Sequence, residues 1–210
     1  MAGRHEAGAR RRSRLMGVTR VRPAAGPVSP WQLRIELLDV SPRVWRRLLV
    51  PSNIKLPALH RVFQATLGWT DSHLHEFAIN GVRYAEPNPD WEDELKQADE
   101  RRVALDAALG RGSRCFDYVY DFGDHWHHVV LVEDTFIQPQ ADFRIQCIAG
   151  ENACPPEDVG GAPGYANFLA AIADPRHEEH QDYMEWSGGG FDSGRFDLEI
   201  VNAALTRIRI

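Results

Sequence analysis

The sequence predicts an α+β protein in which hairpins build a mostly antiparallel sheet. Three observations support this fold class. Segments with the two-residue apolar period of half-buried strands come in consecutive pairs. One segment of helical period separates the first pair from the second. Longer helical periods then return near the C-terminus, where we expect two or three helices.

The opening hairpin and the helix after it carry the clearest patterns. From Trp31 to Leu37 apolar and polar residues alternate, residues 39–42 turn the chain, and residues 44–50 form the returning strand. From Pro57 onward apolar residues recur three and four positions apart until Gly68. Because proline suits the first turn of a helix and glycine its end, this segment is predicted to be one helix packed early in the chain.

Two further hairpins follow the helix. Residues 75–79 and 82–84 are joined by Asn80-Gly81, a pair that tolerates the positive φ angles of a two-residue turn. Residues 115–120 and 126–133 form the third hairpin, with residues 121–124 as its turn. The first half of this layout resembles a β-grasp arrangement.

The remaining segments are predicted as loops and helices. We expect a loop at residues 85–102, a short helix at 103–109, a loop at 147–161, and helices at 165–172, 178–186 and 198–208. Large aromatic residues most simply anchor a core, and we expect this of Trp31, Trp45, Trp69 and Trp186.

Charge divides the chain into two parts. Residues 1–30 hold seven arginines and one acid, so the rest of the chain carries a net charge of -12 within the total of -6. We expect residues 1–30 to form a disordered Arg-rich tail and residues 31–210 to form a single domain. The acidic body disfavours nucleic acid, so weak nonspecific contact by the tail is the only such binding expected.

The remaining composition indicates a cytoplasmic protein without membrane contact. No apolar run approaches the roughly 20 residues that cross a bilayer, and the tail lacks the apolar stretch of a secretory signal. Three cysteines do not make a disulfide framework, and the spacing of Cys147 and Cys154 is too long for a zinc knuckle. We expect these two to be small buried hydrophobic residues. The alternatives are a loop disulfide and binding of one metal ion together with the histidines.

Histidines and acids gather in two cassettes, residues 68–77 and 120–128. In an extended segment His73 and His75 would point the same way, whereas Trp126 and His128 share one strand face and His125 and His127 the other. Asp121 and Asp124 lie where carboxylates cap turns, which is a structural alternative to metal binding. The candidate ligands of a divalent metal ion, the one cofactor that this pattern suggests, are His73, His75, Asp121, Asp124 and His128.

These cassettes, taken with others, resemble a known family. The quoted segments are Trp45 to Pro51, Leu59-His60, Gly68 to Phe77, Tyr120 to Asp124 with Trp126 and His128, and Cys154 to Gly161. They are similar to the plasmid pRiA4b open-reading-frame-three-like family over about residues 31–205. The resemblance implies a plasmid or mobile-element context and no established activity. Some members are labelled resolvase-like, but the acidic body lacks an activated serine among arginines, so we reject recombinase chemistry.

Two classes of function remain. The first is a noncatalytic module that binds a protein or small-molecule ligand in a groove, and it is the class the sequence favours. The candidate groove residues are Trp69, Asp71, His73, His75, Glu76, Asp121, Asp124, Trp126, His128, Glu157 and Asp158. The alternative is a metal-dependent, hydrolase-like enzyme with Glu76 or Glu157 as general base. Ligands of one metal must converge on a common point, so spatial convergence separates the two.

Overall fold

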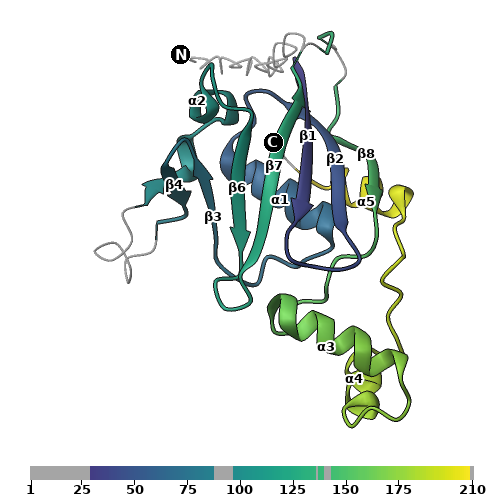
Figure 1. Ribbon diagram of the computed structural model, residues 1–210. Helices are drawn as coiled ribbons and strands as arrows, with labels where there is room; N and C mark the ends of the chain where they lie inside the picture. Colours follow the sequence, from purple (N-terminus) through teal and green to yellow (C-terminus); the bar gives the residue numbers. More distant parts are fainter. Residues whose placement is uncertain (1–28, 88–96, 136, 140–142, 209–210) are drawn as a thin grey trace, which may run out of the picture.

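The computed structural model describes residues 29–87, 97–135, 137–139 and 143–208, so residues 1–28 of the predicted tail lie outside the described part. Its strands are β1 (Pro30–Leu37), β2 (Val44–Pro51), β3 (His75–Ile79), β4 (Val82–Ala85), β5 (Ala98–Asp99), β6 (Cys115–Tyr120), β7 (Trp126–Asp134) and β8 (Gln146–Glu151). They form one sheet in the order β5-β4-β3-β6-β7-β1-β2-β8 (Figure 1). Among the described strands only β4 and β5 pair in parallel, so the predicted α+β class with mostly antiparallel pairing is confirmed.

The three predicted hairpins are confirmed, and their order in the sheet differs from their order in the chain. The third hairpin lies in the middle, because β7 pairs with β1 and β6 pairs with β3. As a result, the start of β3 lies beside the turn between β6 and β7, since His75 is opposite Tyr120. This arrangement places the two histidine cassettes at the same end of the sheet.

Two segments predicted as loops contain short strands. β8 lies at the start of the predicted 147–161 loop, and β5 lies within the predicted 85–102 loop, followed by the 3-10 helix η1 (Glu100–Arg102). Glycine weakens a strand pattern, but at Gly150 it is required, because an added Cβ would lie 2.6 Å from the Phe196 ring. β8 is a strand because it pairs with the edge of β2, and its local sequence does not predict this pairing.

Helix α1 (Leu56–Leu67) covers one face of the sheet (Figure 1). It buries Leu59, Val62 and Phe63, and the Phe63 ring lies 5.1 Å from that of Tyr118. Each such side chain stabilises the fold by about 1.5–3 kcal/mol. The helix ends at Gly68 with φ +86, the left-handed conformation that favours glycine.

The remaining helices are α2 (Leu105–Leu109), α3 (Gly161–Ala173), α4 (His180–Trp186) and α5 (Leu198–Leu205). Helices α3 and α4 project beyond the end of the sheet at which the histidine cassettes lie, whereas α5 lies near β8 (Figure 1). Trp69 is buried as predicted, but the prediction for Trp186 is wrong, since 48% of this residue is exposed. No helix among the described residues is long and apolar enough to span a membrane.

Candidate functional site

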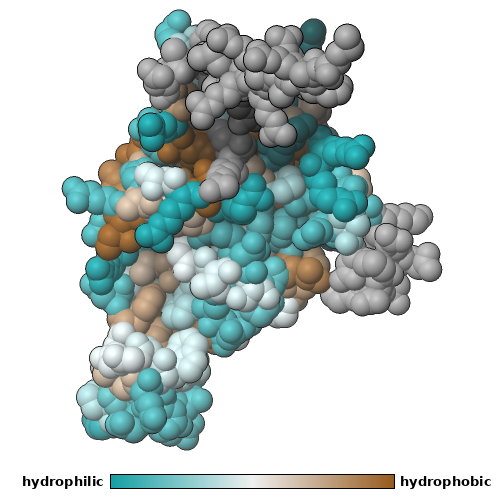
Figure 2. Space-filling view, turned by 180° about the vertical axis from the view of Figure 1, so that it is seen from behind, coloured by the Kyte–Doolittle hydropathy of each residue, from teal (hydrophilic) through white to brown (hydrophobic). Residues whose placement is uncertain are grey.

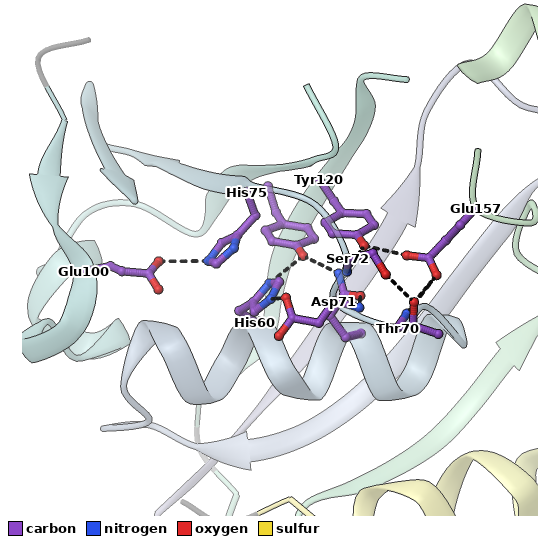
Figure 3. Close-up of polar contacts among 10 residues, drawn as sticks. His60, Thr70, Asp71, Ser72, His75, Glu100, Tyr120 and Glu157 are labelled. Carbon is purple, nitrogen blue, oxygen red and sulfur yellow. Dashed lines mark hydrogen bonds and ion pairs between the residues drawn. The ribbon is translucent and has the colours of Figure 1, made fainter. Parts of the chain in front are cut away.

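The two histidine cassettes and residues 155–158, which are far apart in the sequence, meet at one end of the sheet. Trp69 Nε1 donates to the Pro155 carbonyl at 2.9 Å, and the Tyr120 hydroxyl donates to Glu157 Oε1 at 2.5 Å. Glu157 Oε2 accepts from the Thr70 amide at 3.1 Å and from the Thr70 hydroxyl (Figure 3). These bonds fasten residues 155–158 to the segment that leads into β3 and to the end of β6.

The turn between β6 and β7 also packs directly against the start of α3. A Cβ on Gly161 would lie 2.5 Å from the Asp124 carbonyl oxygen, and Gly161 has a φ of +67. The Asp124 carboxylate accepts from the Gly160 amide at 3.2 Å. These contacts bring Asp158 beside the turn. Asp124 thus has a structural role, since it holds the turn against the start of α3.

His73, Asp121 and Asp158 converge at this junction, and we call them the His73 triad. Each offers one ligand atom, and these atoms all lie within 4.8 Å of one another. His73 Nε2 lies 3.0 Å from Asp158 Oδ1 and 3.6 Å from Asp121 Oδ2. The nitrogen is buried yet hydrogen-bonds to neither of these oxygens.

The backbone orients Asp121 within the triad. Its Oδ1 accepts from the amides of Gly123 at 2.9 Å and Asp124 at 3.3 Å, and its own amide donates to the Leu74 carbonyl at 2.9 Å. These bonds occupy one carboxylate oxygen and leave Oδ2 facing His73. Asp121 therefore caps the turn, as the structural alternative predicted, and also belongs to the triad.

A second group of convergent donors comprises His60, Asp71 and His75. His60 of α1 stacks on His75 of β3 with ring centroids 3.5 Å apart and planes 4° apart. His60 Nε2 lies 2.6 Å from Asp71 Oδ1, and His75 Nε2 lies 3.1 Å from a Glu100 oxygen (Figure 3). Together with Tyr118, these residues form what we call the His60 network.

Hydrogen bonds fix the tautomer of His60. Gln64 Oε1 accepts a hydrogen bond from the Asp71 amide at 3.0 Å. Gln64 Nε2 must therefore be the group that donates to the Tyr118 hydroxyl at 3.1 Å. The hydroxyl then donates to His60 Nδ1 at 2.8 Å, which leaves the ring proton on Nε2 for Asp71. Burial, and then the neighbouring His75, lower the pKa of His60 to about 4, so the ring is neutral at pH 7. Both of its nitrogens are engaged.

A cleft of about 600 Å³ opens beside these groups. Its walls include His60, Asp71, His73, His75 and Glu100. His73 is the residue that the cleft shares with the triad, so a ligand in the cleft would meet the triad at this imidazole.

Comparison with known proteins identifies the family. The family model described as plasmid pRiA4b ORF-3-like protein matches residues 30–200. The chain belongs to this family. Uncharacterized protein y4hQ of Sinorhizobium fredii (strain NBRC 101917 / NGR234) is 41% identical over 176 residues, which cover 83% of this chain and 89% of that protein. The crystal structure of a protein of unknown function, MM3350 from Methanosarcina mazei Go1, is similar with a TM-score of 0.71 and 31% identity, covering 81% of this chain and 96% of that one.

In this pRiA4b ORF-3-like protein, the five predicted metal ligands lie in different places. His73 and Asp121 belong to the triad, His75 belongs to the His60 network, and Asp124 fastens the turn. His128 is buried in the core, where its Nδ1 donates to the Tyr118 carbonyl at 3.2 Å and burial lowers its pKa to about 3. We expected His73 and His75 to point the same way, and this is wrong. His73 precedes β3 and faces Asp158, whereas His75 lies in the strand and faces Glu100.

The other groove candidates of this family member also separate. Trp69 and Trp126 are buried with ring centroids 5.9 Å apart, so they form core and not a groove wall. Glu76 is buried, pairs with Arg83 at 3.2 Å, and accepts from Gln97 at 2.9 Å. Of the remaining candidates, Asp71 lines the cleft and Asp158 belongs to the triad. Glu157 accepts the hydrogen bonds from Tyr120 and Thr70 described above.

Sequence reasoning missed the buried part of the site in this family member. His60, Gln64 and Glu100 are all buried, and none was a candidate. His60 and Gln64 stand four residues apart on the α1 face that packs on the sheet, and two polar residues at that spacing on an apolar face were the available signal. Cys147 and Cys154 are free and buried, so the expectation of small buried hydrophobic residues is confirmed.

Proposed function

We propose that this protein binds a divalent metal ion at the His73 triad and presents it to a ligand in the cleft. The observation that supports this is the buried His73 Nε2, which lies 3.0 and 3.6 Å from two carboxylate oxygens without hydrogen bonding to either. Donors bound at about 2.1 Å to one metal ion lie about 3.0–3.5 Å apart, so these spacings suit ligands around a common ion. An ion pair between protonated His73 and the aspartates is the competing arrangement.

The donor set also indicates which ions would fit. Two carboxylates and a neutral imidazole carry a charge that a divalent cation balances. Mixed nitrogen and oxygen ligands suit zinc or manganese better than calcium. Three protein ligands leave a further position for water, as in catalytic metal sites.

This arrangement favours the metal-dependent, hydrolase-like class over the noncatalytic module. A metal-bound water would be the nucleophile, and the reaction would need a nearby proton acceptor. Glu76 and Glu157 are poorly suited to that role, since each is held by several donors. Asp71 lines the cleft with a side chain that is 51% exposed, and we assign proton acceptance to it.

The physiological setting is also a proposal. A cytoplasmic location is supported by the free thiols of Cys115, Cys147 and Cys154. A plasmid or mobile-element origin is supported by the family's description.

Metal analysis and zinc or manganese titration of the full chain test the function. We expect one ion per chain and a tenfold or greater loss of affinity in Asp158→Asn, whose side chain is 71% exposed and therefore tolerates replacement. His127→Ala is the matched control, because His127 pairs with Asp117 away from the triad. A folded wild type that binds neither ion would overturn the proposal. Loss of the ion in His75→Ala, with retention in His73→Ala, would move the site to the His60 network.

A further inference from the structure

A second pocket lies where α4 meets the loop that carries Asp158. Its volume is about 330 Å³, and we call it the α4 pocket. Its walls are Asp158, Val159, Glu179, Asp182, Tyr183 and Trp186. The lobe formed by α3 and α4 projects from the body of the molecule, as the view from behind also shows (Figure 2).

One wall of the α4 pocket is a half-exposed indole that its neighbours hold in place. Trp186 is 48% exposed, although tryptophan usually buries most of its surface. The buried Phe168 ring meets it edge-on at 5.6 Å and 82°, and the Tyr183 ring does so at 6.2 Å and 78°. These contacts fix the ring without covering it.

The remaining wall is acidic. Asp158, Glu179 and Asp182 contribute three carboxylates, and none of the described residues of the wall is a lysine or an arginine. In the described part of the chain these three do not form a group whose ligand atoms converge, whereas the His73 triad does. Carboxylates spread around an aromatic ring suit an organic cation better than a metal ion.

We propose that the α4 pocket binds the guanidinium group of an arginine side chain in a basic peptide partner. A guanidinium stacks on an indole and bonds carboxylates through its planar fork, whereas an ammonium offers only a point charge. The net charge of -12 outside residues 1–30 favours a basic partner. Because Asp158 belongs to both sites, a peptide held here would pass beside the His73 triad, but the binding itself does not require a metal.

Fluorescence anisotropy of a labelled arginine-containing peptide, titrated with the full chain in EDTA, tests this inference. We expect Trp186→Leu and Asp182→Asn each to weaken binding about two- to fivefold, and a lysine peptide to bind more weakly than its arginine counterpart. Glu185→Gln is the matched control, because it removes the same charge from α4 outside the pocket wall. Circular dichroism confirms folding of each variant.

Three results would overturn the inference. They are no binding of the arginine peptide to wild type, an equal loss in Glu185→Gln and Asp182→Asn, and equal affinity for the lysine peptide. Equal loss would show general attraction to an acidic surface, and equal affinity would remove the guanidinium assignment. Because EDTA keeps metal out of the assay, failure here leaves the proposed metal site untouched, and failure of metal binding leaves this inference standing.

Discussion

Replacing Gly161 with alanine tests whether the close approach of α3 to the β6–β7 turn forms the His73 triad. The added Cβ would lie 2.5 Å from the Asp124 carbonyl oxygen, and the backbone would have to keep a φ of +67. A left-handed alanine costs about 1 kcal/mol, and forcing the two backbones apart adds about 1–3 kcal/mol. We therefore expect Gly161→Ala to lower the free energy of unfolding by about 2–4 kcal/mol.

Gly188→Ala separates these two contributions. Gly188 has a similar φ of +71, but a Cβ there would meet nothing within 4 Å. This variant should lose only the backbone cost of about 1 kcal/mol. Urea denaturation followed by circular dichroism measures both values. If the two variants lose the same stability to within about 0.5 kcal/mol, the backbone contact does not carry the energy assigned to it.

The same pair of variants links the fold to the metal site. Under conditions where Gly161→Ala remains folded, its zinc affinity should fall about tenfold, because Asp158 moves away from His73 with the loop. Gly188→Ala should keep the wild-type affinity, since Gly188 lies beyond the end of α4. Unchanged zinc affinity in Gly161→Ala would refute the link between this contact and the triad.

Three further predictions follow from buried polar groups. Burial lowers the pKa of His60 to about 4 and that of His128 to about 3, from 6.5, so below pH 6.5 the unfolded chain binds protons that the native state does not. Stability measured in urea should therefore fall by up to about 1.4 kcal/mol per pH unit for each histidine as pH drops toward 4, and a flat profile from pH 6.5 to 5 would contradict this. Tyr120→Phe removes the hydroxyl that joins the Ser72 amide to Glu157, and it should lower the free energy of unfolding by about 1–2 kcal/mol in the same assay. Unchanged stability would show that this hydroxyl does not hold the two segments together. Arg46→Lys should lower the free energy of unfolding by about 2–4 kcal/mol, because the buried guanidinium donates to four carbonyls. Arg47→Lys should lower it by less than about 1 kcal/mol, because its pair with Glu133 is partly exposed. Equal losses in the two variants would contradict a special stabilising role for the buried Arg46 guanidinium.

Local sequence determined most of the secondary structure, because the signals are short-range. Alternation from Trp31 to Leu37, the turn pair Asn80-Gly81 and the glycine after α1 each act through neighbouring residues, and the structure has the strands, turn and helix end they predict. The face assignment of β7 also follows from local period, since Trp126 and His128 are buried and His127 is partly exposed.

Tertiary structure alone decided which polar residues meet. His73 and His75 differ by two positions, yet one faces Asp158 and the other Glu100, because β3 begins between them. Asp121 and Asp158 are brought together by a contact between backbones at Gly161, and no local pattern encodes that contact. The sequence by itself thus determined the strands of the three hairpins, the first helix, the family and the cassettes. Their convergence depends on strand order and close packing between distant segments, which only the folded chain specifies.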